Sequence, residues 1–175
     1  TVRHVGGDAR LEGPGGVVVA ASPVGMDITP AGAPVQAGRR AFRGVIDVTP
    51  RPDGLWVVNR IDSELYLRGV VPREMSASWG DDAPAALQAQ AVAARTYAIA
   101  HVTPQRSYDV TDDTSDQVYE GATAEDRRSN AAIDATAGVV MTYKGAPINA
   151  MFSSTSGGYT EDYVNVFGGS PVPYL

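Results

Sequence analysis

The segment that most constrains the fold is the alanine-rich stretch "PAALQAQAVAARTYAIAH" at residues 84–101. Pro84 suits the first turn of a helix, and Asp82 just before it is a candidate N-cap. Apolar side chains recur along the stretch at helical spacing, at Leu87, Ala91, Ala94 and Ala98. Because alanine lets neighbouring backbones approach closely, we predict a central helix that is buried on several sides and packed against a sheet.

Turn residues separate apolar runs elsewhere in the chain and predict two β-hairpins. "AFRGVIDVTP" and "LWVVNRI" flank the turn residues 52–54, Pro-Asp-Gly, and "VVMTY" and "PINAMFSS" flank Lys144-Gly145. "SELYLRGVV" predicts a short helix that leads into Pro72. The tail after these elements is predicted to be a loop.

A second helix is predicted from Thr123 to about Ala137. Thr123 and Asp126 resemble a capping box, and Gly138 is a stop signal. The layout predicts an α+β fold, with mixed or antiparallel sheet and hairpins packed on the alanine-rich helix and on this second helix. We expect residues 1–40 to be a β-rich part of the same domain as residues 41–175, because the length suits one domain.

Composition limits the partners of the chain. A formal net charge of −6 and a sequence pI near 4.8 argue against nucleic acid, but leave a polar polymer such as a polysaccharide open. There is no cysteine, so a disulfide frame and a thiolate metal site are excluded. No apolar run approaches membrane-spanning length, and the start, "TVRHVGGDAR", has no signal-peptide core; earlier removal of a leader stays open.

Two kinds of site have weak signals. The three serines of "FSSTSGGYT" lack a G-x-S-x-G elbow, so a serine nucleophile with His101 as base is less favoured than a polar loop that hydrogen-bonds a ligand. A calcium loop fails because no glycine stands at the sixth position and Thr123 stands at the twelfth. We therefore predict no metal, and a solvated loop, for the carboxylate cluster of Asp109, Asp112, Asp113 and Asp116.

Glu74 follows Pro72 by two positions, in "VPREM". The ordinary interpretation is a carboxylate in the first turn of a helix. Arg95 lies among small residues on the predicted buried helix, where an arginine needs a partner or a ligand. The side chains that are near Glu74 in sequence and able to desolvate it are Tyr66, Met75 and Trp79.

Five segments in order resemble the stage II sporulation protein D family, which includes the amidase enhancers. They are "YLRGVVPREM", "ALQAQAVAARTYA", "DQVYEG", "ATAGVVMTYKGAPINAMFSSTSGGYTE" and "PVPYL". The resemblance runs from about Phe42 to Leu175 and leaves residues 1–40 uncovered. Five such motifs in register are far more specific than any one of them.

The resemblance implies an exported bacterial protein that acts on peptidoglycan, is secreted or associated with the cell wall, and uses no cofactor. Well-understood relatives are lytic transglycosylases that cut glycan strands already stripped of stem peptides, and an N-acetylmuramoyl-alanine amidase is implied as a partner. The family's catalytic glutamate, in V-P-x-E-M, is Glu74 here. The arginine of A-A-R-T-Y, here Arg95, is also implicated in activity.

Further substrate-binding candidates are polar and aromatic. Ring faces for sugars are expected from Tyr97, Tyr119 and Tyr159. Hydrogen bonds to hydroxyl or acetamido groups are expected from Gln88, Asp112, Gln117, Ser154 and Ser156.

Two departures from the family pattern matter. Some relatives bind zinc through Cys and His in the loop that matches "YDVTDDTSDQVY", but this chain offers Thr111, Thr114, Ser115 and Asp116 there, so the metal is not carried over. Relatives also usually continue past the "PYL" motif, so we expect a short member or a chain truncated at the C-terminus.

The implied chemistry needs one acid. A lytic transglycosylase protonates the leaving oxygen, the muramic acid 6-hydroxyl attacks, and the same carboxylate recovers a proton, which gives a 1,6-anhydro end. The acid must keep its proton near neutral pH, which burial favours. A first-turn position and a nearby Arg95 would instead favour the charged form, so either desolvation dominates or Arg95 holds substrate.

Three functions remain open on the sequence. The first is the lytic transglycosylase with Glu74 as acid and base. The second is a binding module that grips glycan and stimulates a partner amidase without cutting. The third is an ordinary glycoside hydrolase in which an acid such as Asp112 is the second carboxylate.

Overall fold

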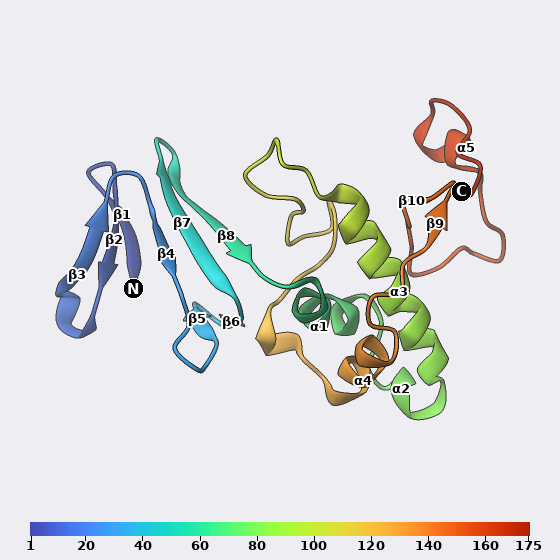
Figure 1. The fold of residues 1–175 in the computed structure, drawn as a ribbon, viewed down its shortest axis with the longest axis horizontal. Coiled ribbons are helices and arrows are strands. Elements are labelled where there is room, and N and C mark those ends of the chain that lie inside the picture. The colour runs from blue at the N-terminus through green and yellow to red at the C-terminus, as the bar shows by residue number, and fades with distance from the viewer.

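The computed structural model describes residues 1–175, and its N-terminal part is built from antiparallel sheets (Figure 1). One sheet has the order β1-β2-β3, a second has the order β4-β7-β8, and β5 pairs with β6. The strands are β1 (Val2–Val5), β2 (Asp8–Glu12), β3 (Val18–Ser22), β4 (Met26–Ile28), β5 (Val35–Ala37), β6 (Arg40–Phe42), β7 (Val45–Arg51) and β8 (Gly54–Arg60), with a 3-10 turn η1 at Pro14–Gly16. Residues 1–40 are thus β-rich.

The β7–β8 hairpin confirms the first predicted hairpin. Its strands pair from Val45 opposite Arg60 to Arg51 opposite Gly54, and Gly54 takes the positive φ of 147° that the turn requires. One face is buried through Ile46 and Val48, which form a small core with Ala9 of β2. On β8, Trp56 pairs with Thr49 and points to the opposite face, where it is 40% exposed.

A helical layer follows, next to the sheets (Figure 1). It contains α1 (Ser63–Glu74), α2 (Trp79–Asp82), α3 (Pro84–His101), η2 (Ala122–Ala124) and α4 (Arg127–Ala135). The alanine-rich helix is confirmed as α3, and Leu87, Ala91 and Ala94 are fully buried. Its main neighbours are α1 and α4, so the alanine positions allow helix-on-helix packing rather than packing on a sheet.

Two helix starts differ from the sequence prediction. Asp82 ends α2, and the N-cap of α3 is Ala83, which makes no side-chain cap bond. In α4 the cap is Asp126, whose carboxylate accepts from the Arg128 N–H, while Thr123 accepts from the Ala41 N–H. Thr123 is therefore used to join two layers and is not available as a cap.

Helix α1 is longer than predicted and contains Pro72. Asp62 caps its start by accepting from the Glu64 N–H, and the Met75 N–H bonds to the Val71 carbonyl at its end. Glu74 is consequently the last residue of a helix, and the interpretation that it lies in a first turn is wrong. Glu74 lies at the negative end of the helix dipole.

The C-terminal segment forms a second hairpin and a short helix. β9 (Thr142–Tyr143) and β10 (Ala146–Pro147) are shorter than predicted, and Lys144 and Gly145 between them both have positive φ, 51° and 85°. The tail, predicted to be a loop, contains α5 (Tyr163–Phe167). The α+β class is confirmed, and none of the helices has the length and apolarity needed to span a bilayer.

Candidate functional site

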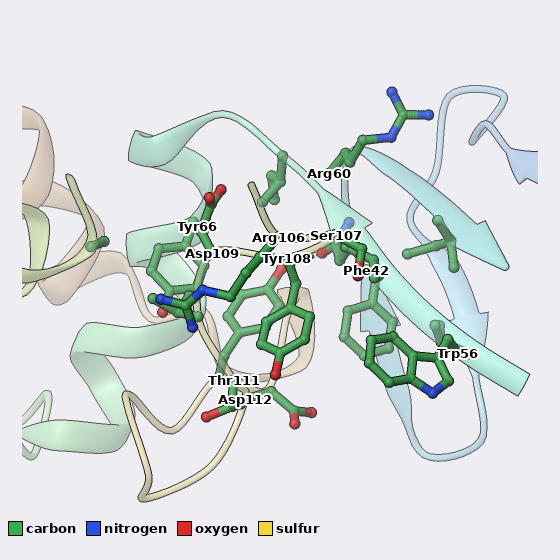
Figure 2. Close-up of a pocket in the computed structure, with 18 of the residues that line it drawn as sticks. Phe42, Trp56, Arg60, Tyr66, Arg106, Ser107, Tyr108, Asp109, Thr111 and Asp112 are labelled. Atoms are coloured by element: carbon green, nitrogen blue, oxygen red, sulfur yellow. Dashed lines mark hydrogen bonds between the residues drawn. The ribbon is translucent and has the colours of Figure 1, made fainter. Parts of the chain in front are cut away.

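A groove of about 760 Å³ lies between the β7–β8 hairpin and the loop 102–113 that follows α3. Figure 2 shows Tyr108 of this loop between Trp56 on the strand side and Tyr66 on the helix side. The Trp56 and Tyr108 rings are tilted at 54° with centroids 5.8 Å apart. Five aromatic side chains line the groove: Phe42, Trp56, Tyr66, Tyr108 and Tyr119.

Polar contacts fix the floor and the rim of the groove. The Tyr119 hydroxyl donates to Asn59 Oδ1 at 2.7 Å, and Asn59 Nδ2 donates to the Arg43 carbonyl at 2.8 Å. Burial raises the pKa of Tyr119 to about 12, so its hydroxyl stays a donor at neutral pH. At the rim, Asp112 pairs with Arg40 at 2.6 Å. The groove thus brings together two of the predicted residues, Asp112 and Tyr119.

Glu74 lies outside this groove, half-buried at the end of α1. Its Oε1 accepts one hydrogen bond, from the Val118 N–H at 2.9 Å. Its Oε2 has no hydrogen bond within the chain and is not among the buried unpartnered atoms, so this oxygen reaches the surface. Glu74 makes no ion pair with any of the basic side chains that form salt bridges. Oε1 of Glu74 is therefore fixed by a hydrogen bond, whereas Oε2 is unpaired and reaches the surface.

The side chains expected to desolvate Glu74 lie in different surroundings. Tyr66 is buried in the helical core, and Met75 is partly buried against that core. Trp79 is 53% exposed. The apolar side chains near the C-terminal end of α1 therefore lie on the side that faces the helical core.

The peptide that bonds Glu74, residues 116–118, is held by buried side chains. Gln117 is fully buried, accepts from the Tyr66 hydroxyl at 3.0 Å and donates to the Ala94 carbonyl at 3.3 Å. Asp116 accepts from the Tyr97 hydroxyl at 2.8 Å. Both ends of the Gln117 amide are therefore bonded to groups of the protein. The Tyr97 ring stacks on His101 with centroids 4.0 Å apart.

Arg95 is buried in an ion pair with Glu64. Its Nε and Nη2 each donate to a carboxylate oxygen at 2.7 Å, and its Nη1 donates to the Val139 carbonyl at 3.1 Å. This bidentate partner lowers the pKa of Glu64, against the opposing effect of burial. The structure does not bring Arg95 to Glu74, and only 1% of the Arg95 side chain is exposed.

The other predicted residues lie in separate places. Gln88 lines a hollow of about 250 Å³ beside Arg127 and Arg128. Ser154 and Ser156 are exposed, and Tyr159 is 89% exposed. His101 Nδ1 contacts the Tyr97 carbonyl at 2.7 Å, so its contacts are within α3 and not with a serine. No group of three or more His, Asp and Glu side chains is placed to hold a metal ion.

The sequence interpretation missed the groove residues Trp56, Tyr108 and Asn59. Trp56 had no alternation signal, because Leu55, Trp56, Val57 and Val58 form a continuous apolar run. Tyr108 had no such signal, since its position depends on how the loop 102–113 folds back over the hairpin.

Comparison with known proteins defines the class of this chain. The family model "SpoIID: Stage II sporulation protein" matches residues 51–143, which include α1, α3, α4 and Glu74. The chain therefore belongs to the stage II sporulation protein D family. No solved structure matches it.

Relatives in bacteria agree with this assignment. The chain is 40% identical over 137 residues to an uncharacterized protein of Brachyspira hyodysenteriae (strain ATCC 49526 / WA1), covering 77% of this chain and 36% of that protein. It is 45% identical over 109 residues to the amidase enhancer of Bacillus subtilis (strain 168), covering 62% of this chain and 14% of that protein. It is 36% identical over 135 residues to stage II sporulation protein D of the same organism, covering 67% and 38%. The chain spans well under half the length of each.

Proposed function

We propose that this chain acts outside the cytoplasm as a peptidoglycan lytic transglycosylase, with Glu74 as its general acid and base. The observation that carries the proposal is the state of the Glu74 carboxyl, with Oε1 held by the Val118 N–H and Oε2 unpaired at the surface. A group that transfers a proton needs a fixed orientation and one free oxygen. The family membership of the segment around Glu74 supports the same role.

The chemistry follows from a single carboxyl. Glu74 protonates the oxygen between N-acetylmuramic acid and N-acetylglucosamine, and the bond from that oxygen to the muramic acid ring breaks. The 6-hydroxyl of the same muramic acid attacks the ring carbon and gives its proton to Glu74, which leaves a 1,6-anhydro end. An ordinary hydrolase needs a second carboxylate beside the acid, but Asp112 is paired with Arg40 at the groove rim.

The groove supplies a surface for the rest of the strand. Pyranose rings have apolar C–H faces that pack on the negative faces of aromatic rings, and Trp56 and Tyr108 offer such faces. Arg106 lines the groove without an ion-pair partner, which suits the lactyl carboxylate of a strand without peptides.

Digestion of peptide-free glycan strands tests the activity. Wild type should release products that are lighter by one water than hydrolytic products in mass spectrometry. Glu74→Gln should lower the cleavage rate at least about 100-fold, as loss of acid catalysis does, and should still bind strands. Glu12→Gln, which alters a partly buried carboxylate of β2 paired with the exposed Arg3, is the matched control and should cut like wild type. Undiminished cleavage by Glu74→Gln would rule the proposal out.

A second function has its own support. Glu74 does not line the aromatic groove, and one relative is named an amidase enhancer. A module that binds glycan through the groove and stimulates an amidase, without cutting, needs only the groove. In that case wild type produces no new ends, and Trp56→Ala abolishes amidase stimulation whereas Glu74→Gln preserves it.

A further inference from the structure

The peptide that holds Glu74 has no regular structure of its own. Residues 117–120 lie outside every helix and strand, so no ladder of backbone hydrogen bonds fixes the Val118 N–H against Glu74 Oε1. Such a segment keeps its position only if side chains or neighbouring elements hold it. The contacts of Asp116 and Gln117 hold this N–H from one side, and on the other side the Tyr119 and Glu120 N–H groups bond to the Asp112 and Gly69 carbonyls.

Asp116 is the more connected of these two residues. One of its oxygens, Oδ1, accepts from the Tyr97 hydroxyl at 2.8 Å. The other, Oδ2, accepts from the N–H and the hydroxyl of Thr111, at 2.8 and 3.0 Å. Through these bonds, the carboxylate of Asp116 near the end of the 111–118 loop links the start of that loop to α3.

Asp116 and its donors Tyr97 and Thr111 form a junction whose charge state is well defined. Burial opposes the charged form of Asp116, but the hydrogen bonds from Thr111 and Tyr97 and the nearby His101 hold its pKa below the usual range. Burial and the bond to Asp116 raise the pKa of Tyr97 to about 12. Near neutral pH the junction is thus a carboxylate with three donors, and charge-assisted bonds of this kind are stronger than neutral ones.

We propose that Asp116, held by Tyr97 and Thr111, is a positioning residue that fixes the Val118 N–H on Glu74 Oε1 and so assigns Oε2 as the oxygen that delivers the proton. An amide N–H only donates, so the oxygen that it contacts stays an acceptor. The proton of the neutral acid is then on Oε2, which has no partner in the chain and reaches the surface. This inference rests on the proposed function for its kinetic consequence.

Tyr97→Phe is the variant that tests the inference. It removes one donor to Asp116 and keeps the ring that stacks on His101, so the protein should fold. The loss of one hydrogen bond should speed hydrogen exchange of the Val118 amide and lower kcat, each by between about twofold and about tenfold, with KM little changed.

Control variants separate this effect from a general loss of rigidity in the protein. Tyr143→Phe removes a hydroxyl on the exposed β9 strand, far from the junction in sequence and with no hydrogen bond of its own, and should match wild type in all three measurements. Asp116→Asn, which keeps the shape and removes the negative charge, should speed Val118 exchange and lower kcat, as Tyr97→Phe does. A lower kcat with unchanged Val118 exchange would overturn the inference.

The two proposals fail in different ways. If wild type cuts no glycan, the proposed activity is wrong, and Val118 exchange alone decides the positioning role. In that case Tyr97→Phe should still speed Val118 exchange, and should do so less in a Glu74→Ala background, where the acceptor is gone. Equal effects of Tyr97→Phe in both backgrounds would show that Asp116 does not act on this bond.

Discussion

Arg95 shows how one residue can matter without meeting a ligand. The sequence correctly predicted that an arginine on a buried helix face needs a partner, but the choice between Glu74, a sugar and a third residue depended on tertiary structure. Glu64 was not singled out, because an acid in the first turn of a helix has an ordinary explanation. We expect a supporting role for Arg95, since protein groups occupy its guanidinium.

Glu64→Gln should destabilise the fold by about 3 kcal/mol at pH 7, because it leaves the buried Arg95 charge with a poorer partner. Urea unfolding measures this, and Glu12→Gln, whose partner Arg3 is largely exposed, should cost no more than about 1 kcal/mol. The folded-state pKa of Glu64 lies below its ordinary value of 4.5. The stabilisation is therefore present above pH 4.5 and is lost as pH falls below it, so the difference between wild type and variant should narrow in acid. A difference independent of pH would contradict the role of the ion pair.

Gly69 is a second residue that only the structure explains. A Cβ added there would lie 2.5 Å from Cε2 of Tyr119 and 2.9 Å from the Gly121 carbonyl. Although alanine favours a helix by about 1 kcal/mol over glycine, Gly69→Ala should lower the free energy of unfolding by about 1–3 kcal/mol because of overpacking. Thermal unfolding measures the change, and a more stable variant would show that Tyr119 moves freely.

At the scale of elements, turns were predicted well and helix ends poorly. Turn residues such as 52–54 and Lys144-Gly145 have strong local preferences, so the two hairpins could be predicted from sequence. The end of α1 could not, because proline usually breaks a helix, whereas here the helix continues through Pro72 to Glu74. The sequence interpretation therefore placed Glu74 at the positive end of a helix dipole, whereas it lies at the negative end.

Pro72→Ala tests whether the end of α1 positions Glu74. Proline in a helix interior costs up to about 3 kcal/mol relative to alanine, so the variant should be at least as stable as wild type. Because a changed last turn moves the carboxyl, cleavage of glycan should fall by between about tenfold and about 100-fold. Melting temperature and initial rates measure the two effects, and full activity would mean that Pro72 does not set the geometry.

At the scale of the whole molecule, there are two cores of unequal size. The core under the sheets contains Ala9, Ile46 and Val48, whereas the helical core contains ten buried residues. Composition and the run of elements predicted the α+β class, but not this division. This division depends on which faces of the strands and helices pack together, and contacts between residues that are distant in sequence determine that packing.

Native-state hydrogen exchange should reveal the unequal cores. Amides of β1, β2 and β3 should exchange at lower free energies of opening than amides of α1 and α3, because fewer buried apolar contacts hold them. Equal protection across the chain would show that the layers unfold as one unit.

The groove has one wall from each layer. Phe42, Trp56 and Asn59 come from the strands, and Tyr66, Tyr108 and Asp112 come from the helical side, while Glu74 belongs to the helical side alone. Grafting a different β7–β8 hairpin that keeps Asn59, the partner of Tyr119, would therefore remodel one wall and leave the acid in place. Under the proposed function, glycan recognition and the reaction at Glu74 would then be separable, so a graft of this kind could change glycan preference without changing the acid.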